Sequence, residues 1–320
     1  MGIRGIRRQL RALVAPTSLG IMRRRAARLD WPGVQRLGAR LGRWGRPLAR
    51  HRVFFARDNL RLVFGDELDA RQRNTLALRA FESAGRLGVE MLKLPTMSPE
   101  ELAAVARFDG LEVLAAARTA GRGAIAVSAH LGNWEVGAVR LIYEGYQVVA
   151  LSRASQSARI ARAVTGVRKE LDFATIPVDD GIRPCLRLLQ DNGILAIMPD
   201  RRARGHGVNV QFFGYPVNVW HTPVLLALRS GAPVIPLHAL RQSDGTFVVR
   251  IEEPIPLVDT GDRDHDVQTG TQQLFDRLEA RIREHPEQYL WQYDLWLEAM
   301  LDDERFPRWR WEDHPELSRS

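Results

Sequence analysis

The chain has 320 residues, 45% of them hydrophobic and 26% charged, which is the composition of a folded globular protein and excludes a disordered one. Its formal net charge is +8, and all but two of its 46 basic residues are arginine. The single cysteine, Cys185, excludes an intrachain disulfide, and no run of apolar residues is long enough to predict a membrane span.

The positive charge is concentrated at the N-terminal end. Residues 1–57 contain 15 arginines and one acidic residue, Asp30, whereas residues 259–320 contain 16 acidic residues and 8 arginines. Apolar residues are interleaved with the first arginines, and Pro16 interrupts them. This pattern is typical of an interfacial segment on an anionic membrane surface. We therefore expect residues 1–60 to form a basic, helical, membrane-interfacial extension.

The next part of the chain is predicted to be helical. Apolar residues recur at helical spacing over 69–94, and this pattern ends before Pro95. Ser98 and Glu101 have the spacing of a capping box at the start of a further helix. The segment 107–110 is expected to break the chain.

From residue 124 onward, short apolar runs alternate with helical patterns. The alternation predicts an α/β fold with a mainly parallel central sheet flanked by helices. We expect strands over 125–128, 147–151, 174–177, 194–198, 234–240 and 247–251, the last of them antiparallel. We expect helices over 111–119, 134–143, 155–170, 181–191, 222–230 and 266–284. No linker divides the chain, so we expect one domain over 61–300 that follows the extension over 1–60 and precedes a tail over 301–320.

The segment from Ser128 to Glu135 predicts a catalytic site. An apolar run precedes His130 and a helix is expected from Trp134, so His130 should lie where a parallel strand ends. Open α/β sheets bind their ligands at that edge. We interpret His130 as a general base that deprotonates a hydroxyl, and Glu135 as the carboxylate that orients its imidazole. The alternative is a core histidine beside a surface glutamate.

The turn between this strand and its helix offers a second candidate feature. Backbone N–H groups at Gly132 and Asn133 are candidates for stabilising an oxyanion or binding a phosphate, which would make Asn133 a substrate-binding residue. The alternative is that Asn133 is a simple N-cap of the helix.

Further polar residues are expected at the same edge of the sheet. Arg153 follows one predicted strand and is a candidate for binding a phosphate of the donor or the acceptor. Asp200 follows another strand and is expected to position an arginine or the acceptor. Arg201, Arg202 and Arg204 are candidates for an anion-binding loop for a phosphorylated sugar or headgroup. The alternative for Arg153 is an arginine on the surface without a ligand. The alternative for Arg201, Arg202 and Arg204 is a solvated loop.

His130-x4-Glu135 is the first of five sequence blocks, and it is followed by segments 150–153, 197–216, 226–236 and 285–291. Together, in this order, the blocks resemble the bacterial lipid A late acyltransferases, the lauroyl and myristoyl acyltransferase family, and their relatives the phosphatidylinositol mannoside acyltransferases. The resemblance covers about residues 105–291. It implies a glycerolipid-acyltransferase-like fold.

The resemblance also implies an activity. The chain would transfer a fatty acyl chain from acyl carrier protein or acyl-CoA to a hydroxyl of a lipid, most simply a lipid A precursor, with another glycolipid or an aminolipid as the alternative acceptor. The implied catalytic residues are His130 and Glu135. No cofactor is implied, and the sequence has no metal-binding motif. The implied location is the cytoplasmic face of the inner membrane, as a peripheral or monotopic protein.

A basic protein that binds nucleic acid or a membrane without catalysis is the alternative of a different class. The basic arm has no zinc-finger, RNP or zipper pattern, so no nucleic-acid partner is expected. The aromatic segment 212–216 is either part of the core or part of an acyl-chain groove.

Overall fold

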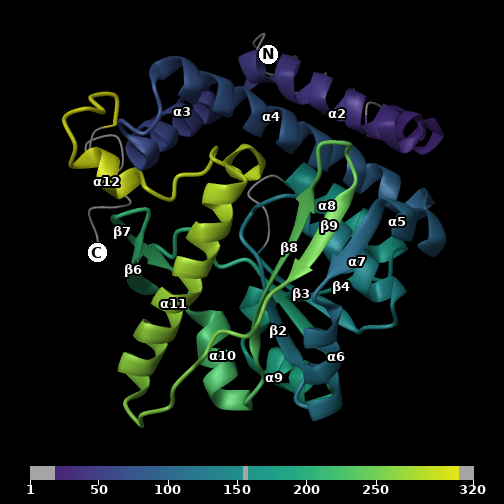
Figure 1. Cartoon of the computed structure of the whole chain (residues 1–320), viewed down its shortest axis with the longest axis vertical. Helices are drawn as coiled ribbons and strands as arrows, with labels where there is room; N and C mark the ends of the chain where they lie inside the picture. Colours follow the sequence, from purple (N-terminus) through teal and green to yellow (C-terminus); the bar gives the residue numbers. More distant parts are fainter. Residues whose placement is uncertain (1–18, 154–157, 310–320) are drawn as a thin grey trace, which may run out of the picture.

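Seven strands form the central sheet of the computed structural model, which describes residues 19–153 and 158–309 (Figure 1). Their order across the sheet is β1-β9-β8-β2-β5-β3-β4. The strands are β1 (Ala106–Asp109), β2 (Ala124–Val127), β3 (Val148–Ser152), β4 (Ala174–Pro177), β5 (Ile194–Ile197), β8 (Val234–Arg241) and β9 (Phe247–Ile251). Every pairing is parallel except that of β8 with β9. The predicted α/β fold is therefore confirmed.

Helices cover both faces of this sheet, because the central strands are apolar on both sides. On one face, Ile125 and Leu195 belong to a core shared with α9, α10 and α11. On the other face, Ala126 and Val148 belong to a core shared with α6, α7 and α8. These helices are α6 (Leu111–Ala120), α7 (Trp134–Tyr143), α8 (Ala158–Glu170), α9 (Arg183–Gln190), α10 (Thr222–Ser230) and α11 (Arg263–Glu284).

Two strand elements differ from the sequence-based expectation. The segment expected to break the chain forms β1, which pairs with β9 at the edge of the sheet and is too short and too polar to give an apolar run. The loop after β5 contains a hairpin of β6 (Val208–Phe212) and β7 (Tyr215–Val219). Its two-residue turn, Phe213-Gly214, has positive φ at both positions. Turns with this geometry usually have the sequence Asn-Gly. Because the first turn residue here is phenylalanine, the sequence did not predict a hairpin.

The N-terminal extension packs against the domain through a close helix crossing. Its helices are a segment over 19–28, α2 (Trp31–Gly45) and α3 (Arg50–Phe64), and they are followed by α4 (Ala70–Lys93) and α5 (Pro99–Val105). A Cβ atom on Gly42 of α2 would lie 2.0 Å from the carbonyl oxygen of Phe81 on α4, so only glycine permits this approach. The boundary expected at residue 60 falls inside α3. The capping box of Ser98 and Glu101 is present at the start of α5.

A buried carboxylate links this helical cover to the sheet. Glu90 of α4 is fully buried, and Arg241 at the end of β8 donates two hydrogen bonds to it, at 2.9 and 2.7 Å. Gln35 of α2 and Asn133 at the start of α7 each donate one more at 2.6 Å. Four elements therefore meet on one charge, and truncation of Glu90 would leave Arg241 buried without its partner.

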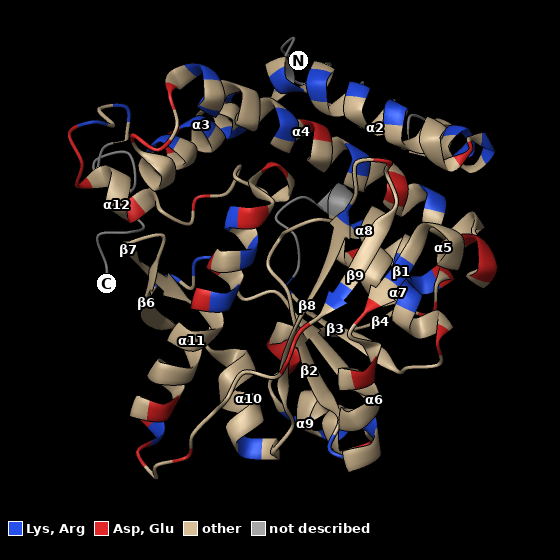
Figure 2. Cartoon of the chain, in the orientation of Figure 1, with Lys and Arg blue, Asp and Glu red and all other residues tan. Residues whose placement is uncertain are grey.

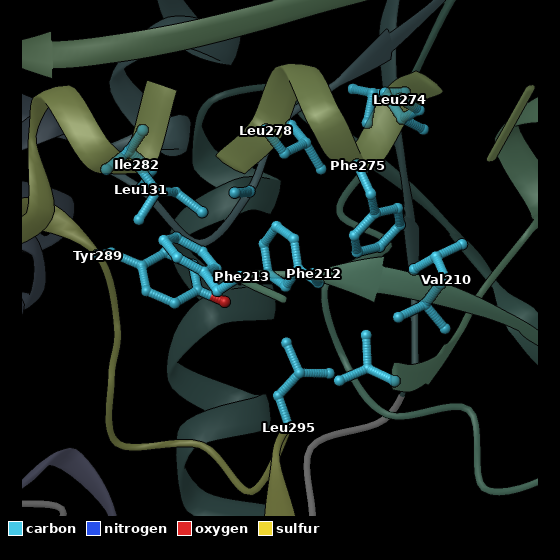
Figure 3. Packing of buried hydrophobic residues seen from close by; sticks show 14 of the residues in the cluster. Leu131, Val210, Phe212, Phe213, Leu274, Phe275, Leu278, Ile282, Tyr289 and Leu295 are labelled. Carbon is cyan, nitrogen blue, oxygen red and sulfur yellow. The ribbon is translucent and has the colours of Figure 1, made fainter. Parts of the chain in front are cut away.

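The C-terminal part of the chain closes the core beside the hairpin. Phe212, Phe213 and Leu131 pack with Phe275 and Tyr289 (Figure 3), so the two phenylalanines of the aromatic segment 212–216 belong to the core. The remaining short elements are α12 (Leu297–Leu301) and 3-10 turns at Arg46–Ala49, Leu94–Thr96, Val178–Asp180 and Pro286–Gln288. Within the described residues, no helix is both long and apolar enough to cross a membrane. The predictions for residues 1–18 and 310–320 lie outside the described residues.

Candidate active site

His130 and Asp200 meet at the carboxyl end of the parallel strands. His130 follows β2 and Asp200 follows β5, and these two strands are neighbours in the sheet. The Nδ1 atom of His130 lies 2.7 Å from Oδ1 of Asp200, and the backbone N–H of His130 donates to Oδ2 at 2.8 Å. Both carboxylate oxygens therefore hold the same residue, and the ring nitrogen that remains to accept a proton is Nε2.

Burial and charge make Asp200 an effective partner for an imidazolium. Its full burial would by itself raise its pKa, but the charge and hydrogen bonds of His130, with a smaller effect of Arg201, hold the pKa of Asp200 below its usual value. Tyr289 lies close to Asp200: burial, and then the negative charge of Asp200, raise the pKa of Tyr289 well above its usual value, so its hydroxyl stays neutral beside the carboxylate.

Aromatic side chains and one loop fix the position of His130. Its ring lies edge-on to Trp134 and Tyr293, at centroid distances of 5.1 and 5.2 Å. The backbone N–H of Leu290 donates to the carbonyl of His130 at 3.0 Å. The His130 side chain is 12% exposed, so a substrate can reach it while most of its surface is packed.

Glu135 does not orient His130 in the structure. It is 3% exposed and accepts hydrogen bonds from Arg168 of α8, at 3.1 and 2.5 Å, and from the indole N–H of Trp134 at 3.1 Å. The spacing explains this difference: five residues turn about 140° beyond one helical turn, and Glu135 lies in the first turn of α7 while His130 precedes the helix. The carboxylate that contacts His130 is that of Asp200.

Asn133 is an N-cap of α7, which is the alternative to a substrate-binding role. It is fully buried, and its side-chain oxygen accepts hydrogen bonds from the backbone N–H groups of Glu135 and Val136, as an N-cap does. The backbone N–H groups of Gly132 and Asn133 donate to the carbonyls of Gln288 and Ala239. Neither the Asn133 side chain nor these two N–H groups are available to substrate, which corrects the expectation for them.

The candidate arginines have two kinds of neighbour: aromatic rings for Arg153 and Arg201, and acidic side chains for Arg202 and Arg204. Arg153 lies 4.6 Å over the ring of Trp220, and Arg201 lies 3.5 Å over the ring of Tyr293, so Arg201 borders the histidine. The Arg202 side chain is 3% exposed and lies 3.7 Å from Asp294 and 3.6 Å from Glu298. Arg204 is half exposed and lies 3.9 Å from Asp294. The basic loop is therefore not one anion cradle, and Arg202 in particular is turned into the protein.

An apolar pocket extends from the site along the sheet beneath α7. Ala126, Ala196 and Ala150 stand side by side in register on β2, β5 and β3, and their small side chains leave the space that larger residues would fill. Ser128, Ser152, Met198 and Trp134 line its end near His130, and Leu141, Val148 and Phe173 line the opposite end.

Sequence reasoning missed the roles of Tyr289, Tyr293 and Arg168. Both tyrosines belong to or follow the last sequence block, but nothing in their spacing indicates contact with residue 130. The described residues contain no group of three or more His, Cys, Asp or Glu side chains that could hold a metal ion.

A histidine–carboxylate pair at the carboxyl edge of an α/β sheet, with an apolar pocket beside it, has the chemistry to deprotonate a hydroxyl group. The family model for the bacterial lipid A biosynthesis acyltransferases matches residues 10–298, and the chain belongs to this family of acyltransferases.

Named relatives agree with this membership. The chain is 29% identical over 256 residues to the phosphatidylinositol mannoside acyltransferase of Mycobacterium tuberculosis, covering 78% of each chain. It is 25% identical over 257 residues to lipid A biosynthesis acyltransferase 2 of Shigella flexneri, covering 79% of this chain and 80% of the relative. Among solved structures, the 1-acyl-sn-glycerophosphate acyltransferase PlsC of Thermotoga maritima matches with a TM-score of 0.33 and 15% identity over 76% of this chain and 98% of that chain.

Proposed function

We propose that this protein transfers a fatty acyl chain from an acyl thioester to a sugar hydroxyl of a glycolipid, with His130 as general base and Asp200 as the residue that orients it. The observation that carries the proposal is the His130–Asp200 pair beside an apolar pocket, which Trp134, a ring neighbour of His130, helps to line. Glycolipids are the acceptors in the names of the relatives, either a phosphatidylinositol mannoside or lipid A.

The proposed reaction begins with proton transfer from the acceptor hydroxyl to Nε2 of His130. The hydroxyl oxygen attacks the thioester carbonyl and forms a tetrahedral intermediate, while Asp200 stabilises the imidazolium. When the intermediate collapses, the carbon–sulfur bond breaks and the imidazolium returns the proton to the thiolate. The products are an ester and a free thiol, and His130 is neutral again.

The apolar pocket is proposed to hold the acyl chain. From Val148 to Ser152 the pocket follows β3 over four residue steps of about 3.3 Å, which is a length of about 13 Å. A saturated chain advances about 1.25 Å per carbon, given tetrahedral angles and carbon–carbon bonds of about 1.5 Å. The pocket lining thus spans the length of about ten carbons, but its volume of about 80 Å³ accommodates only a short part of such a chain; Leu141, Val148 and Phe173 line the end away from His130.

The alanine row gives a test of this assignment. Ala196→Leu fills the centre of the pocket and should shift the preferred donor to a shorter chain, because each excluded methylene forfeits about 0.8 kcal/mol of burial. Ala115→Leu, on the exposed side of α6, is the matched control. An unchanged chain-length profile for Ala196→Leu would place the acyl chain elsewhere.

Association with an anionic membrane surface at the cytoplasmic face remains part of the proposal. Ile21 is 64% exposed and Trp44 of α2 is 77% exposed, and arginines lie along the same helices (Figure 2). Apolar side chains among arginines suit the headgroup region of an anionic bilayer. Trp44→Glu should weaken binding to vesicles that contain phosphatidylglycerol, as measured by cosedimentation.

The experiment that tests the function compares total lipids by mass spectrometry from cells that express the wild type or His130→Ala. A lipid that gains one acyl chain only with the wild type supports the proposal and identifies the acceptor. Purified protein is then supplied with acyl-CoA or acyl carrier protein, and with a phosphatidylinositol mannoside or a lipid A precursor. Equal products from the wild type and a folded His130→Ala variant would overturn the proposed mechanism.

A further inference from the structure

A cleft rich in arginine lies outside the site described above. It has a volume of about 280 Å³ and is formed by α3, the first part of α4 and the segment that follows α12. The residues that line it are Arg57, Asp58, Arg61, Ala70, Arg73, Asn74 and Arg308.

Among the described residues that line this cleft, arginines outnumber acidic side chains. Asp58 is the one acidic residue in the lining; its Oδ2 accepts a hydrogen bond from the indole of Trp309 at 2.9 Å and lies 3.6 Å from Nε of Arg308. Arg57 and Arg61 are four residues apart on α3, so their like charges share one helix face and repel each other. Neither of them, nor Arg73, forms an ion pair with another described residue.

Contacts outside the cleft hold three of the arginines in place. Arg73 donates to the carbonyl of Gly65 at 2.6 Å, and Arg61 donates to the carbonyl of Arg305 at 3.1 Å. The guanidinium carbon of Arg308 lies 4.5 Å over the ring of Phe54. A guanidinium carries five N–H donors, so each of these side chains keeps donors for a ligand.

We propose that this cleft binds a phosphate group. Guanidinium groups match the geometry of phosphate oxygens and bind them in pairs, and the net charge of the lining requires an anion. The amide of Asn74 adds a neutral donor. A carboxylate ligand would use the same donors less fully, since it has two oxygens to accept hydrogen bonds where a phosphate group has three or more.

The position of the cleft connects it to the acyltransferase site through a single helix. Asn59, which follows Asp58 on α3, donates to the carbonyls of Trp291 and Tyr293 at 2.7 Å each. Tyr293 in turn contacts the ring of His130. The phosphate site and the loop beside His130 thus lie on different sides of α3, separated by about one helix diameter, 10–12 Å. The bound phosphate belongs either to a lipid headgroup at the same surface or to a soluble molecule.

The test measures binding and needs no acyl transfer, so its outcome is independent of the proposed function. Inorganic phosphate is titrated by calorimetry into the full chain at physiological ionic strength, and vesicles of phosphatidylcholine with or without phosphatidic acid are tested by cosedimentation. The variant is Arg57→Gln/Arg61→Gln. The control, Arg187→Gln/Arg229→Gln, removes the same charge from exposed positions on α9 and α10, far from α3 (Figure 1). Arg57→Gln alone retains every contact that holds the cleft together and covers the case in which the double variant does not fold.

Two results support the proposal. Loss of saturable phosphate binding by about tenfold or more in the variant but not in the control assigns the site to a phosphate of either source. Loss of binding only to vesicles with phosphatidic acid, again without an effect of the control, assigns it to a lipid headgroup. Equal losses in variant and control would show that only total charge matters, and no loss in the variant would show that phosphate does not bind in the cleft; either result would overturn the proposal.

Discussion

Asp200 and Glu135 are two buried carboxylates at the same edge of the sheet, and their partners give them different chemistry. Asp200 holds a histidine, whose charge can change during a reaction, whereas Glu135 holds an arginine, which stays protonated. The first pair has an exposed side through His130, and the second is enclosed, with side-chain exposures of 4% and 9%. The comparison teaches that the partner of a carboxylate, more than its place in a motif, indicates whether the carboxylate can assist a proton transfer or only stabilises the fold.

The largest expected effect comes from breaking the proposed catalytic pair, His130 and Asp200. Asp200→Asn should lower kcat by about 10³–10⁴-fold, because the amide neither fixes the Nδ1–H tautomer nor stabilises the imidazolium. The check is steady-state kinetics with a purified acyl donor and acceptor, with circular dichroism to establish folding. Asp200→Glu is the matched variant and should retain part of the activity; a folded Asp200→Asn enzyme with near-normal kcat would contradict the role of Asp200.

Breaking the other pair should affect stability. Glu135→Gln leaves Arg168 buried without its counter-charge and should lower the free energy of unfolding by about 3–5 kcal/mol. The measurement is urea denaturation. The double variant Glu135→Gln/Arg168→Met removes both charges and should recover much of the loss. If Glu135→Gln instead remains stable and loses kcat as Asp200→Asn does, the distinction between the two carboxylates is wrong.

A smaller loss of kcat is expected when Tyr289, a neighbour of Asp200, is replaced. Tyr289→Phe removes the hydroxyl that can donate to the carboxylate and should lower kcat by about tenfold, the scale of one charge-assisted hydrogen bond. It should also move the acidic limb of the pH–kcat profile to higher pH, because the charged form of Asp200 loses a donor. A variant with a lower kcat at every pH and an unshifted acidic limb would show that Tyr289 acts only through packing.

The smallest expected effect is a pH dependence of stability caused by His238. Unlike Asp200 and Glu135, His238 is a buried titratable group that carries no charge. Burial, and then the charge of Arg281, lower the pKa of His238 to about 3, so it stays neutral in the folded protein. The unfolded chain takes up a proton below about pH 6.5, so unfolding becomes easier as the pH falls from there towards 3. Between pH 7.5 and 5.5 this uptake should lower the free energy of unfolding by about 1.4 kcal/mol.

The check on His238 is urea denaturation of wild type and His238→Gln at both pH values. The variant should show a pH dependence weaker by that amount, and the exposed His206→Gln should behave as the wild type does. Identical slopes for wild type and His238→Gln would refute the neutral, buried state.

The sequence predicted the fold well because its strands are apolar runs bounded by helix signals. It also placed His130 and Asp200 at one edge of the sheet. It could not pair them, because the order of parallel strands is set by tertiary packing, and residues 130 and 200 meet only because β2 and β5 are neighbours. The H-x4-E spacing pointed to Glu135 instead, and only the position of Arg168, which arrives from α8, shows which charge Glu135 balances.

The loop that fastens His130 has a consequence for synthesis of the protein. His130 leaves the ribosome roughly 160 residues before Leu290, whose backbone N–H holds the histidine's carbonyl, and at about 5–20 residues per second this interval lasts roughly 8–30 s. Tyr289 and Tyr293 are made in the same late stretch. A nascent chain therefore carries His130 without the residues that hold it in place, and we expect the enzyme to gain activity only when translation is nearly complete.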